Sequence, residues 1–307
     1  MVQLPLVQLI GAQKAGTSAI ADWLFEGGFR RPRVFDSEPC YYRKEAHFFD
    51  IDWNFHKGIN YYASRFEDDS ASGAPALDAT PDTLSFAHRV HGIYQLAGCV
   101  SSVKIIVILR DPISRELSLY NHLAFACRNL NLSELSGWHQ QVTKPDNTIM
   151  SFDEFVQTVT MPALVTHESE DRGLGRSSRY GLFANHLQEW FELFDRDQIL
   201  VLSYDELQTT PSKLQERIQI FLGRIVPGNI YRANENDSPQ KVRLPSHDAE
   251  RSLHSFFGPH NERLYQLLEA APGPPMEQRP FPRFNGVSAK RVELVSKSNS
   301  TEEQNSS

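Results

Sequence analysis

The sequence has little cysteine and no long apolar run. Its three cysteines, Cys40, Cys99 and Cys127, form no C-x-x-C pair and have no spacing that suits a zinc site. No apolar stretch approaches the roughly 18 residues that a membrane-spanning helix requires, and the N-terminus lacks the charged region of a signal peptide. We therefore expect no membrane span in this chain and no metal site built on cysteine, while the pairing of the three cysteines stays open.

Positive charge is not in excess either. The 307 residues contain 31 Lys and Arg against 38 Asp and Glu, which gives a formal net charge of -7. A protein whose whole surface binds nucleic acid needs clustered Lys and Arg to neutralise phosphates, so we expect no nucleic-acid partner. With 40% hydrophobic and 22% charged residues, the composition is that of an ordinary soluble globular protein.

Buried strands and amphipathic helices alternate along the chain. The predicted elements, in order, are a strand over 6–10, a helix over 17–25, a strand from 104, a helix from Pro112 to Phe125, a helix over 181–194, a strand over 198–207 and a helix over 210–222. This alternation predicts an α/β fold in which helices cover both faces of a parallel sheet.

Two loop-rich stretches, Glu67 to Ala76 and Ala126 to Pro145, interrupt the alternation. We expect them to wall a cleft at the ends of the strands, where open α/β sheets bind their ligands. From Val287 onward the chain is polar and has no periodicity, which predicts a disordered tail over 287–307. Residues 1–286 are expected to form a single domain.

The turn after the first strand, Gly11 to Ser18 (GAQKAGTS), has the character of an anion-binding loop. It has two glycines at the spacing of a nucleotide-binding P-loop, but Lys14 precedes Gly16, whereas a nucleoside triphosphatase has its lysine after that glycine. The free N–H groups of a helix N-terminus favour an anion, and the side chains of Thr17 and Ser18 add hydroxyl donors. On the crest of this loop, Lys14 can stabilise the oxygen that leaves from a transferred group.

Two segments resemble a known family. QKAGTSA, Gln13 to Ala19, looks like the 5′-phosphosulfate loop of sulfotransferases that use 3′-phosphoadenosine 5′-phosphosulfate (PAPS), and ILRDPISRELSLY, Ile108 to Tyr120, resembles their 3′-phosphate segment. By this resemblance Arg110 and Ser118 hold the 3′-phosphate, and a guanidinium at a strand end suits the role because it binds phosphate bidentately. The alternative for Arg110 is an ion pair with Asp111 or another nearby carboxylate. In the loop, the resemblance assigns to PAPS the residues Gln13, Lys14, Ala15, Gly16, Thr17 and Ser18.

A third segment narrows the resemblance. KEAHFFDIDWNFHKGINYY, Lys44 to Tyr62, is similar to the region after the first helix in heparan sulfate glucosaminyl N- and 3-O-sulfotransferases, where the glutamate aligned with Glu45 is the catalytic base. Segments 177–207 and 256–268 are similar as well, so the resemblance spans roughly residues 6–270 in the same order. It implies a P-loop-like three-layer fold with a central parallel sheet flanked by helices, a carbohydrate acceptor and no metal requirement.

Two stretches depart from the resembled pattern. Where those enzymes have a lysine-containing EK[ST] stretch, this chain has LDATPDTL, Leu77 to Leu84, which puts the second catalytic lysine in question and with it 3-O-specificity. Later, Ser238 to Asp248 keeps Lys241 and Arg243 of a PAPS-binding loop but lacks its glycine. These two side chains are expected either to bind PAPS or to form a solvated basic turn.

The implied reaction is transfer of a sulfuryl group from PAPS, released as adenosine 3′,5′-bisphosphate, to a hydroxyl or amine of a heparan-sulfate-like glycosaminoglycan or other polysaccharide. We expect Lys14 to stabilise the bridging oxygen while Glu45 removes the proton of the acceptor. His47 is either a rival base, because imidazole titrates near neutrality, or a histidine packed beside two phenylalanines. Asp78 and Asp82 either line the acceptor cleft or are solvated caps.

Other functions stay open from the sequence. Chondroitin-type or small-molecule acceptors fit the same donor loop, and a P-loop nucleotide kinase or a non-catalytic binding module are alternatives to a sulfotransferase. The absence of a lysine after Gly16 counts against the kinase.

The location that the resemblance implies is the Golgi lumen if the native chain carries an N-terminal anchor, and a soluble intracellular protein is expected otherwise. The oligomeric state is not predicted. Asn-x-Ser/Thr tripeptides, which are the acceptor sequences for N-glycosylation, occur at Asn131, Asn236, Asn299 and Asn305.

Overall fold

The structure is a computed structural model, and it describes residues 3–34, 44–67, 73–129, 137, 139–165, 179, 181–230 and 245–284. The chain divides into two compact units, the first formed by residues 1–110, 183–235 and 262–282 and the second by residues 111–182, 236–261 and 283–307. The single domain over residues 1–286 stays a prediction. The tail predicted over 287–307 lies outside the described residues.

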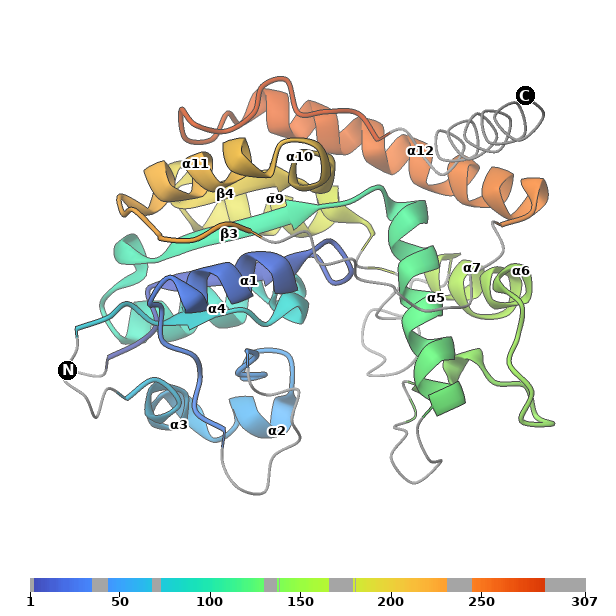
Figure 1. The fold of residues 1–307 in the computed structure, drawn as a ribbon, viewed down its shortest axis with the longest axis horizontal. Helices are drawn as coiled ribbons and strands as arrows, with labels where there is room; N and C mark the ends of the chain where they lie inside the picture. Colours follow the sequence, from blue (N-terminus) through green and yellow to red (C-terminus); the bar gives the residue numbers. More distant parts are fainter. Residues whose placement is uncertain are drawn as a thin grey trace, which may run out of the picture. The chain divides into compact units, whose positions relative to one another are not determined.

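A four-stranded parallel sheet in the order β2-β1-β3-β4 forms the centre of the first unit (Figure 1). Its strands are β1 (Val7–Gly11), β2 (Leu77–Asp78), β3 (Lys104–Leu109) and β4 (Ile199–Ser203). The strands are buried and rich in Ile, Leu and Val, as expected of a parallel sheet covered on both faces. On the outer side of β2, Arg30 forms a parallel bridge with Ala76, and its carbonyl accepts a hydrogen bond from the Leu77 amide at 3.1 Å.

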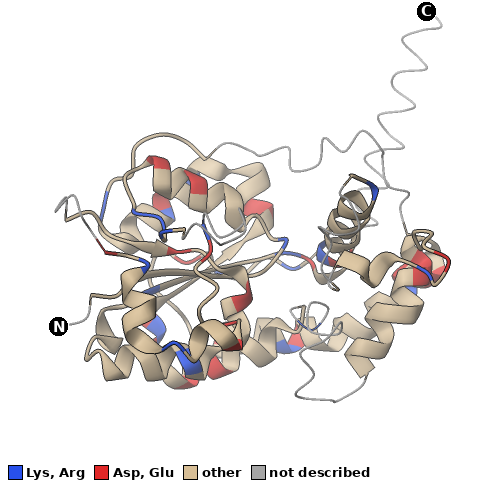
Figure 2. Cartoon of the chain, turned by 90° about the horizontal axis from the view of Figure 1, so that it is seen from below, with Lys and Arg blue, Asp and Glu red and all other residues tan. Residues whose placement is uncertain are grey.

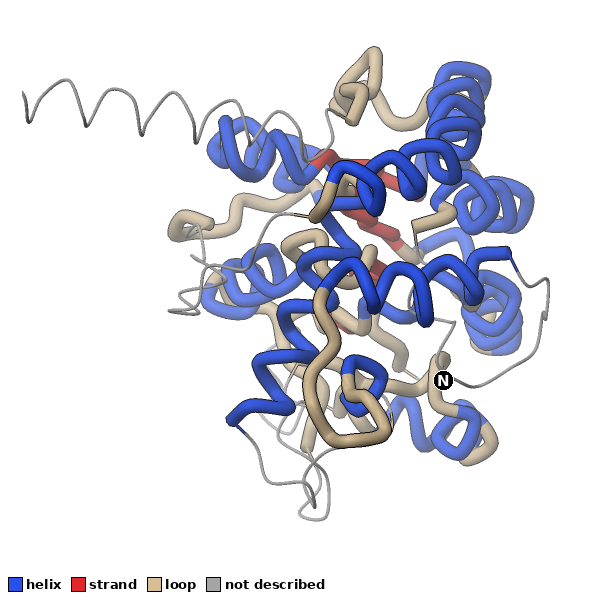
Figure 3. The backbone as a smooth tube through the Cα atoms, turned by 90° about the vertical axis from the view of Figure 1, so that its right-hand side faces the viewer, coloured by secondary structure: helices blue, strands red, loops and turns tan. Residues whose placement is uncertain are grey.

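Helices lie on both sides of this sheet, as the tube in Figure 3 shows. The chain crosses in one direction from β1 through α1 to β2, and in the other direction through α4 to β3 and through α9 to β4. Right-handed crossovers then place α1 and the pair α4 and α9 on opposite faces. The predicted three-layer α/β fold is confirmed. The helices of this unit are α1 (Thr17–Glu26), α2 (Asp52–Phe55), α3 (Gly58–Ser64), α4 (Ala87–Leu96), α9 (Phe183–Leu193), α10 (Tyr204–Thr209) and α11 (Pro211–Leu222), with short 3-10 turns η2 (Pro81–Ser85), η3 (Val100–Ser102) and η7 (Arg196–Gln198).

One predicted strand of this unit is too long. The strand predicted over 198–207 ends at Ser203, because Tyr204 begins α10. The Ser203 hydroxyl accepts a hydrogen bond from the Asp205 amide at 3.2 Å. Asp205 and Glu206 lie in the first turn of the helix, where the helix dipole favours acidic side chains. These local signals favour a helix start over a longer strand.

The second unit is helical in its described part. It contains α5 (Pro112–Asn129), α6 (Phe152–Phe155), α7 (Met161–Val165), the 3-10 turn η5 (His139–Val142), the π-turn η6 (Val156–Thr160) and the N-terminal part of α12 (His247–Ala270), whose C-terminal part belongs to the first unit. Its core joins Leu119 and Leu123 of α5 to Phe155 of α6 and to Leu253 and Phe257 of α12. The unit is therefore held together by one apolar cluster.

The loop predicted over 126–145 begins too early. Helix α5 continues to Asn129 because Ala126 is buried and extends the apolar face of the helix. Arg128 lies in the last turn, where a cation complements the helix dipole. The remainder of that stretch contains η5, and residues 130–136 and 138 lie outside the described residues.

Charges of both signs are interspersed along the helices and loops in Figure 2. Cys99 and Cys127 form no disulfide, and Cys40 lies outside the described residues. No helix in the described ranges is long and apolar enough to cross a membrane.

Because charges of both signs are interspersed (Figure 2), the electrostatics of a site in this protein depend on individual contacts between charged side chains.

We expect Trp190→Phe to destabilise the protein by about 2 to 4 kcal/mol, because it leaves a cavity and removes a buried hydrogen bond. Trp190 is fully buried on α9, and its indole N–H donates to the carbonyl of Leu84 at 2.8 Å. Denaturant unfolding measures the change. Trp53→Phe is the matched control, since Trp53 is 75% exposed and its substitution should change stability by less than about 0.5 kcal/mol. Equal effects of the two substitutions would contradict this account of the core.

Candidate functional site

The loop between β1 and α1 has the backbone of an anion-binding turn. Lys14 has φ 66° and Gly16 has φ 90°, both in the left-handed region. A Cβ on Gly16 would lie 2.6 Å from a methyl group of Leu207, so this position requires glycine for space as well as for conformation. Gly16 caps α1 without any side-chain cap, and the first turn of α1, which begins at Thr17, has no acidic residue. The N-terminus of α1 is therefore electrostatically suited to an anion.

Arg110 lies at the carboxyl end of β3 and contacts this loop. Its Nη1 donates a hydrogen bond to the carbonyl of Lys14 at 2.9 Å, and its guanidinium stacks on the ring of Tyr204 with 4.4 Å between Cζ and the ring centroid. Among the described residues, Arg110 forms no ion pair, and its buried Nε has no hydrogen-bond partner. Asp111, the expected alternative partner, instead accepts from the Ser114 amide at 2.7 Å. Within the described ranges, the positive charge of Arg110 is thus not neutralised by a carboxylate.

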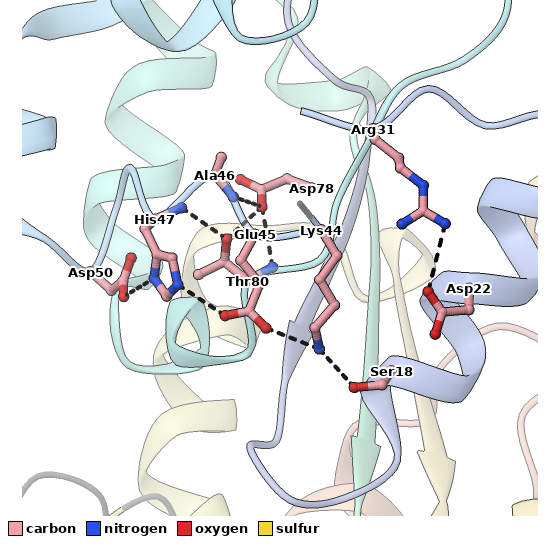
Figure 4. Close-up of polar contacts among 10 residues, drawn as sticks. All are labelled: Ser18, Asp22, Arg31, Lys44, Glu45, Ala46, His47, Asp50, Asp78 and Thr80. Carbon is pink, nitrogen blue, oxygen red and sulfur yellow. Dashed lines mark hydrogen bonds and ion pairs between the residues drawn. The ribbon is translucent and has the colours of Figure 1, made fainter. Parts of the chain in front are cut away.

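A chain of alternating charges leads away from α1 (Figure 4). Lys44 Nζ lies 2.8 Å from Ser18 Oγ, on the first turn of α1, and 2.9 Å from Glu45 Oε1. The other carboxylate oxygen of Glu45 lies 3.0 Å from His47 Nε2, and His47 Nδ1 lies 2.8 Å from Asp50 Oδ2. The arrangement therefore brings Glu45, the predicted base, together with the predicted anion loop through the side chain of Lys44.

The backbone around Glu45 is fixed by the segment after β2. The Ala46 amide donates to Asp78 Oδ1 at 3.3 Å, and the His47 amide donates to Thr80 Oγ1 at 3.2 Å. The Ala79 amide donates to the carbonyl of Lys44, also at 3.3 Å. These bonds support the left-handed conformation of His47, which has φ 47° and which few non-glycine residues adopt. The stretch that departs from the resembled family pattern is thus the support of the Glu45 loop.

Asp78 is only 1% exposed, so it has neither of its two predicted roles: it does not line an acceptor cleft, and it is not a solvated capping residue. Tyr62 donates to Asp78 Oδ2 at 2.9 Å, and Gln8 of β1 donates to the Tyr62 hydroxyl at 2.9 Å. Burial raises the pKa of Asp78, although hydrogen bonds from Thr80, Tyr62 and the Ala46 amide act in the opposite direction. The sequence pattern gave no sign of this network, because the glutamine of an apolar strand is an unremarkable residue by itself.

The charged neighbours of Glu45 and His47 shift their pKa values in opposite directions. Burial raises the pKa of Glu45, but the contacts with His47 and Lys44 outweigh it and hold this pKa below its ordinary value. Burial lowers the pKa of His47, but the contacts with Asp50 and Glu45 outweigh it and hold this pKa well above its ordinary value. At neutral pH the imidazole is then protonated and has no free lone pair. The geometry therefore favours Glu45 over His47 as a proton acceptor.

The family model described as "Sulfotransferase domain" matches residues 5–242. The chain belongs to the sulfotransferase domain family. It is similar over 293 residues, at 26% identity, to "Bifunctional heparan sulfate N-deacetylase/N-sulfotransferase 4" of Mus musculus, with 86% of this chain and 30% of the relative covered. It is also 25% identical over 285 residues to "Heparan sulfate glucosamine 3-O-sulfotransferase 5" of Homo sapiens, with 86% and 72% covered. The chain thus spans less than a third of the length of the bifunctional relative.

A solved sulfotransferase from Alicyclobacillus acidocaldarius has a similar fold. The TM-score is 0.58 and the identity 21%, and the match covers 87% of this chain and 97% of that one. At this identity the likeness concerns the fold alone. It agrees with the parallel sheet and flanking helices described above.

Some predicted ligands of this sulfotransferase belong to the second unit or lie outside the described residues. Ser118 belongs to α5 in the second unit, where it is 4% exposed and its hydroxyl has no hydrogen-bond partner among the described residues. Lys241 and Arg243 lie outside the described residues. Gln13, within the loop, has a buried side-chain oxygen that also lacks a partner in the described ranges. The Ser118 hydroxyl can donate to an anionic ligand, whereas the Gln13 side-chain oxygen can only accept and needs a donor.

The structure offers no metal site in the part of the chain that it describes, where no three or more His, Cys, Asp or Glu side chains gather in a way that could hold an ion. A cavity of about 380 Å³ lies at the other end of the sheet, before the strands begin. Its lining includes Leu4, Leu6, Ala76 and Cys99. It is thus separate from the charged groups at the carboxyl ends of β1 and β3.

We expect Asp50→Asn to lower the pKa of His47, because it removes the carboxylate that offsets the effect of burial. NMR titration of the His47 ring measures the change, and Asp52→Asn is the matched control because Asp52 pairs with Arg89 at 2.6 Å. The stability that protonated His47 contributes is complete below about pH 6.5 and is lost as the pH rises through its raised folded-state pKa. In the Asp50→Asn variant this contribution should be smaller, and its loss should be complete at lower pH. An unchanged His47 titration would contradict the assigned contact.

Proposed function

We propose that this sulfotransferase transfers the sulfuryl group of PAPS to a hydroxyl or amine of a carbohydrate acceptor. The observation that carries the proposal is that an anion-binding loop and an ionised, partly buried carboxylate lie side by side, joined through Ser18, Lys44 and Glu45. A reaction between an anionic donor and a protonated nucleophile needs these two groups next to each other. Membership of the sulfotransferase family supports the same reaction type.

The donor side is assigned to the loop and to Arg110. Residues 13–18 would surround the 5′-phosphosulfate, because the N-terminus of α1 and the side chain of Lys14 favour negative charge. Arg110, together with Ser118, would hold the 3′-phosphate, since its guanidinium is not paired with a carboxylate in the described residues. Lys241 and Arg243 remain candidates for further donor contacts.

The chemical step follows from these assignments. Glu45 accepts the proton of the acceptor hydroxyl or amine, and the oxygen or nitrogen so exposed forms a bond to sulfur. The bond between sulfur and the bridging oxygen breaks, and adenosine 3′,5′-bisphosphate leaves with that oxygen. Lys14 stabilises the negative charge that develops there. Protonated His47 keeps one oxygen of Glu45 oriented, as Asp50 keeps the imidazole oriented.

The proposal of a carbohydrate acceptor is supported by the names of the relatives. Their names specify heparan sulfate, which supports a heparan-sulfate-like glycosaminoglycan or another polysaccharide as the acceptor of this chain. Chondroitin-type and small-molecule acceptors are the alternatives. Sulfate transfer from labelled PAPS to desulfated heparin, heparosan, chondroitin and simple phenols distinguishes these classes.

Adenosine 3′,5′-bisphosphate should raise the melting temperature of the protein without magnesium. A ligand present at 100 times its Kd stabilises the folded state by about 2.7 kcal/mol. Arg110→Gln should reduce the shift, while Arg263→Gln should preserve it, because Arg263 makes exposed hydrogen bonds to the side chains of Asn185 and Gln188. ATP with magnesium should stabilise the protein less. The reverse order of the two nucleotides would exclude the sulfotransferase proposal and support a nucleotide kinase.

Glu45→Gln should reduce sulfate transfer by about 100- to 10,000-fold, because an amide cannot accept the proton of the acceptor. Binding of adenosine 3′,5′-bisphosphate should stay nearly unchanged. Glu154→Gln is the matched control, since Glu154 also pairs with a lysine, Lys144, at 2.6 Å. Sulfate transfer from labelled PAPS measures the rates. Full activity of the Glu45→Gln variant would show that another group is the base.

A further inference from the structure

One ammonium group contacts both sides of the proposed site. Lys44 Nζ lies 2.8 Å from the hydroxyl of Ser18 and 2.9 Å from Oε1 of Glu45 (Figure 4). Ser18 is the last residue of the proposed donor loop and lies in the first turn of α1, whereas Glu45 belongs to a different segment of the chain. In the described residues around Glu45, no other side chain joins the carboxylate to α1.

We propose that Lys44 is a positioning residue for sulfuryl transfer, which fixes the carboxylate of Glu45 against the N-terminus of α1 so that the base faces the donor. This inference rests on the proposed function. It adds a residue to the reaction for which neither the composition nor the motifs of the sequence assign a role. Lys44 acts through Glu45 and Ser18, so it is distinct from Lys14 on the donor loop.

The two oxygens of Glu45 are held from two sides. His47 holds Oε2 at 3.0 Å and is itself held by Asp50, while Lys44 holds Oε1. Each carboxylate oxygen keeps a second acceptor position, so a proton from the acceptor can still be taken up. Without Lys44 the carboxylate would keep its link to His47 but lose its link to α1. The position of the base relative to the donor therefore depends on this lysine.

The setting of Lys44 differs from that of a surface ion pair. The side chains of Lys44 and Glu45 are 24% and 14% exposed, whereas those of Lys144 and Glu154 are 36% and 46% exposed. The carbonyl of Lys44 also accepts a hydrogen bond from the Ala79 amide at 3.3 Å, which anchors its backbone. A partly buried and anchored lysine loses less freedom on pairing and is less screened by salt. This pair is thus suited to hold a geometry.

Charge balance gives Lys44 a second consequence. Lys44 and protonated His47 balance the two carboxylates of Glu45 and Asp50, so the cluster has no net charge beside an anionic donor. Loss of Lys44 would leave one uncompensated negative charge. In the part of the chain that the structure describes, the titratable and charged groups in contact with Glu45 are Lys44 and His47, with Asp50 behind the imidazole. Because Lys44 helps to hold the pKa of Glu45 down, its loss raises that pKa.

The test compares Lys44→Met and Lys44→Arg with the matched control Lys144→Met, which removes a lysine from the Lys144–Glu154 pair. Sulfate transfer is measured with labelled PAPS and the polysaccharide that the wild type uses. A misplacement of about 1 Å can cost about 100-fold in rate, so kcat of Lys44→Met should fall by about that factor. The KM for the donor should change much less. Lys44→Arg should recover part of kcat, and Lys144→Met should behave as wild type.

The pH profile separates a positioning role from a purely structural one. Activity falls as Glu45 becomes protonated, so the acid limb of the kcat profile should move to higher pH in Lys44→Met and stay in place in Lys44→Arg. An acid limb and a kcat like those of the wild type in Lys44→Met would overturn the proposal. So would equal loss of kcat in Lys44→Met and Lys144→Met, or a loss that follows only the folded fraction measured by thermal melting.

The outcome is distinguishable from a failure of the proposed function. If the wild type neither binds adenosine 3′,5′-bisphosphate nor transfers sulfate, the proposed function is wrong and the inference falls with it. If the wild type does both and the Lys44 variants match it, only the inference is wrong.

Discussion

The buried carboxylate of Asp78 holds the loop of Glu45 against the sheet. One of its oxygens accepts from the Ala46 amide and from the Thr80 hydroxyl, and the other accepts from Tyr62. A carboxyl group removed from water costs free energy unless its oxygens are hydrogen bonded, so these contacts form as a set. Through Tyr62 the set reaches Gln8 on β1. The central sheet and the predicted base are therefore positioned by one polar network.

Two electrostatic environments meet beside the first helix. On one side, Arg110 contacts the loop through a carbonyl and an aromatic ring and keeps its charge uncompensated by carboxylates of the described residues. On the other side, lysine, glutamate, histidine and aspartate alternate, so that each charge has a partner. The first environment suits an anion that must bind and leave, and the second suits a proton acceptor whose orientation must persist.

The sequence predicted the parts of the site that depend on local pattern. The loop at Gly16, the strand-end Arg110 and the glutamate at position 45 follow from motifs of a few residues, and the sheet follows from alternating strands and helices. The contact of Ser18 with Lys44 could not be predicted, because residues 26 apart meet only through the path of the chain between them. The choice between Glu45 and His47 likewise needed the position of Asp50, which sets the protonation of the imidazole. A role of Ser118 in holding the 3′-phosphate was predicted only by resemblance and remains a prediction.

The hydrogen bond from the Ala79 amide to the Lys44 carbonyl also concerns the rim of the sheet. The strand β2 is one of the two edge strands of the sheet, and its outward amides would otherwise be open to pairing with another chain. Along this same rim, the backbone carbonyl of Arg30 accepts from the Leu77 amide, and that of Lys44 accepts from the Ala79 amide. The segment that carries the base thus also shields a strand edge. Substitutions that loosen this segment would expose a template for intermolecular strand pairing, so loss of catalytic geometry and a tendency to self-associate would arise together.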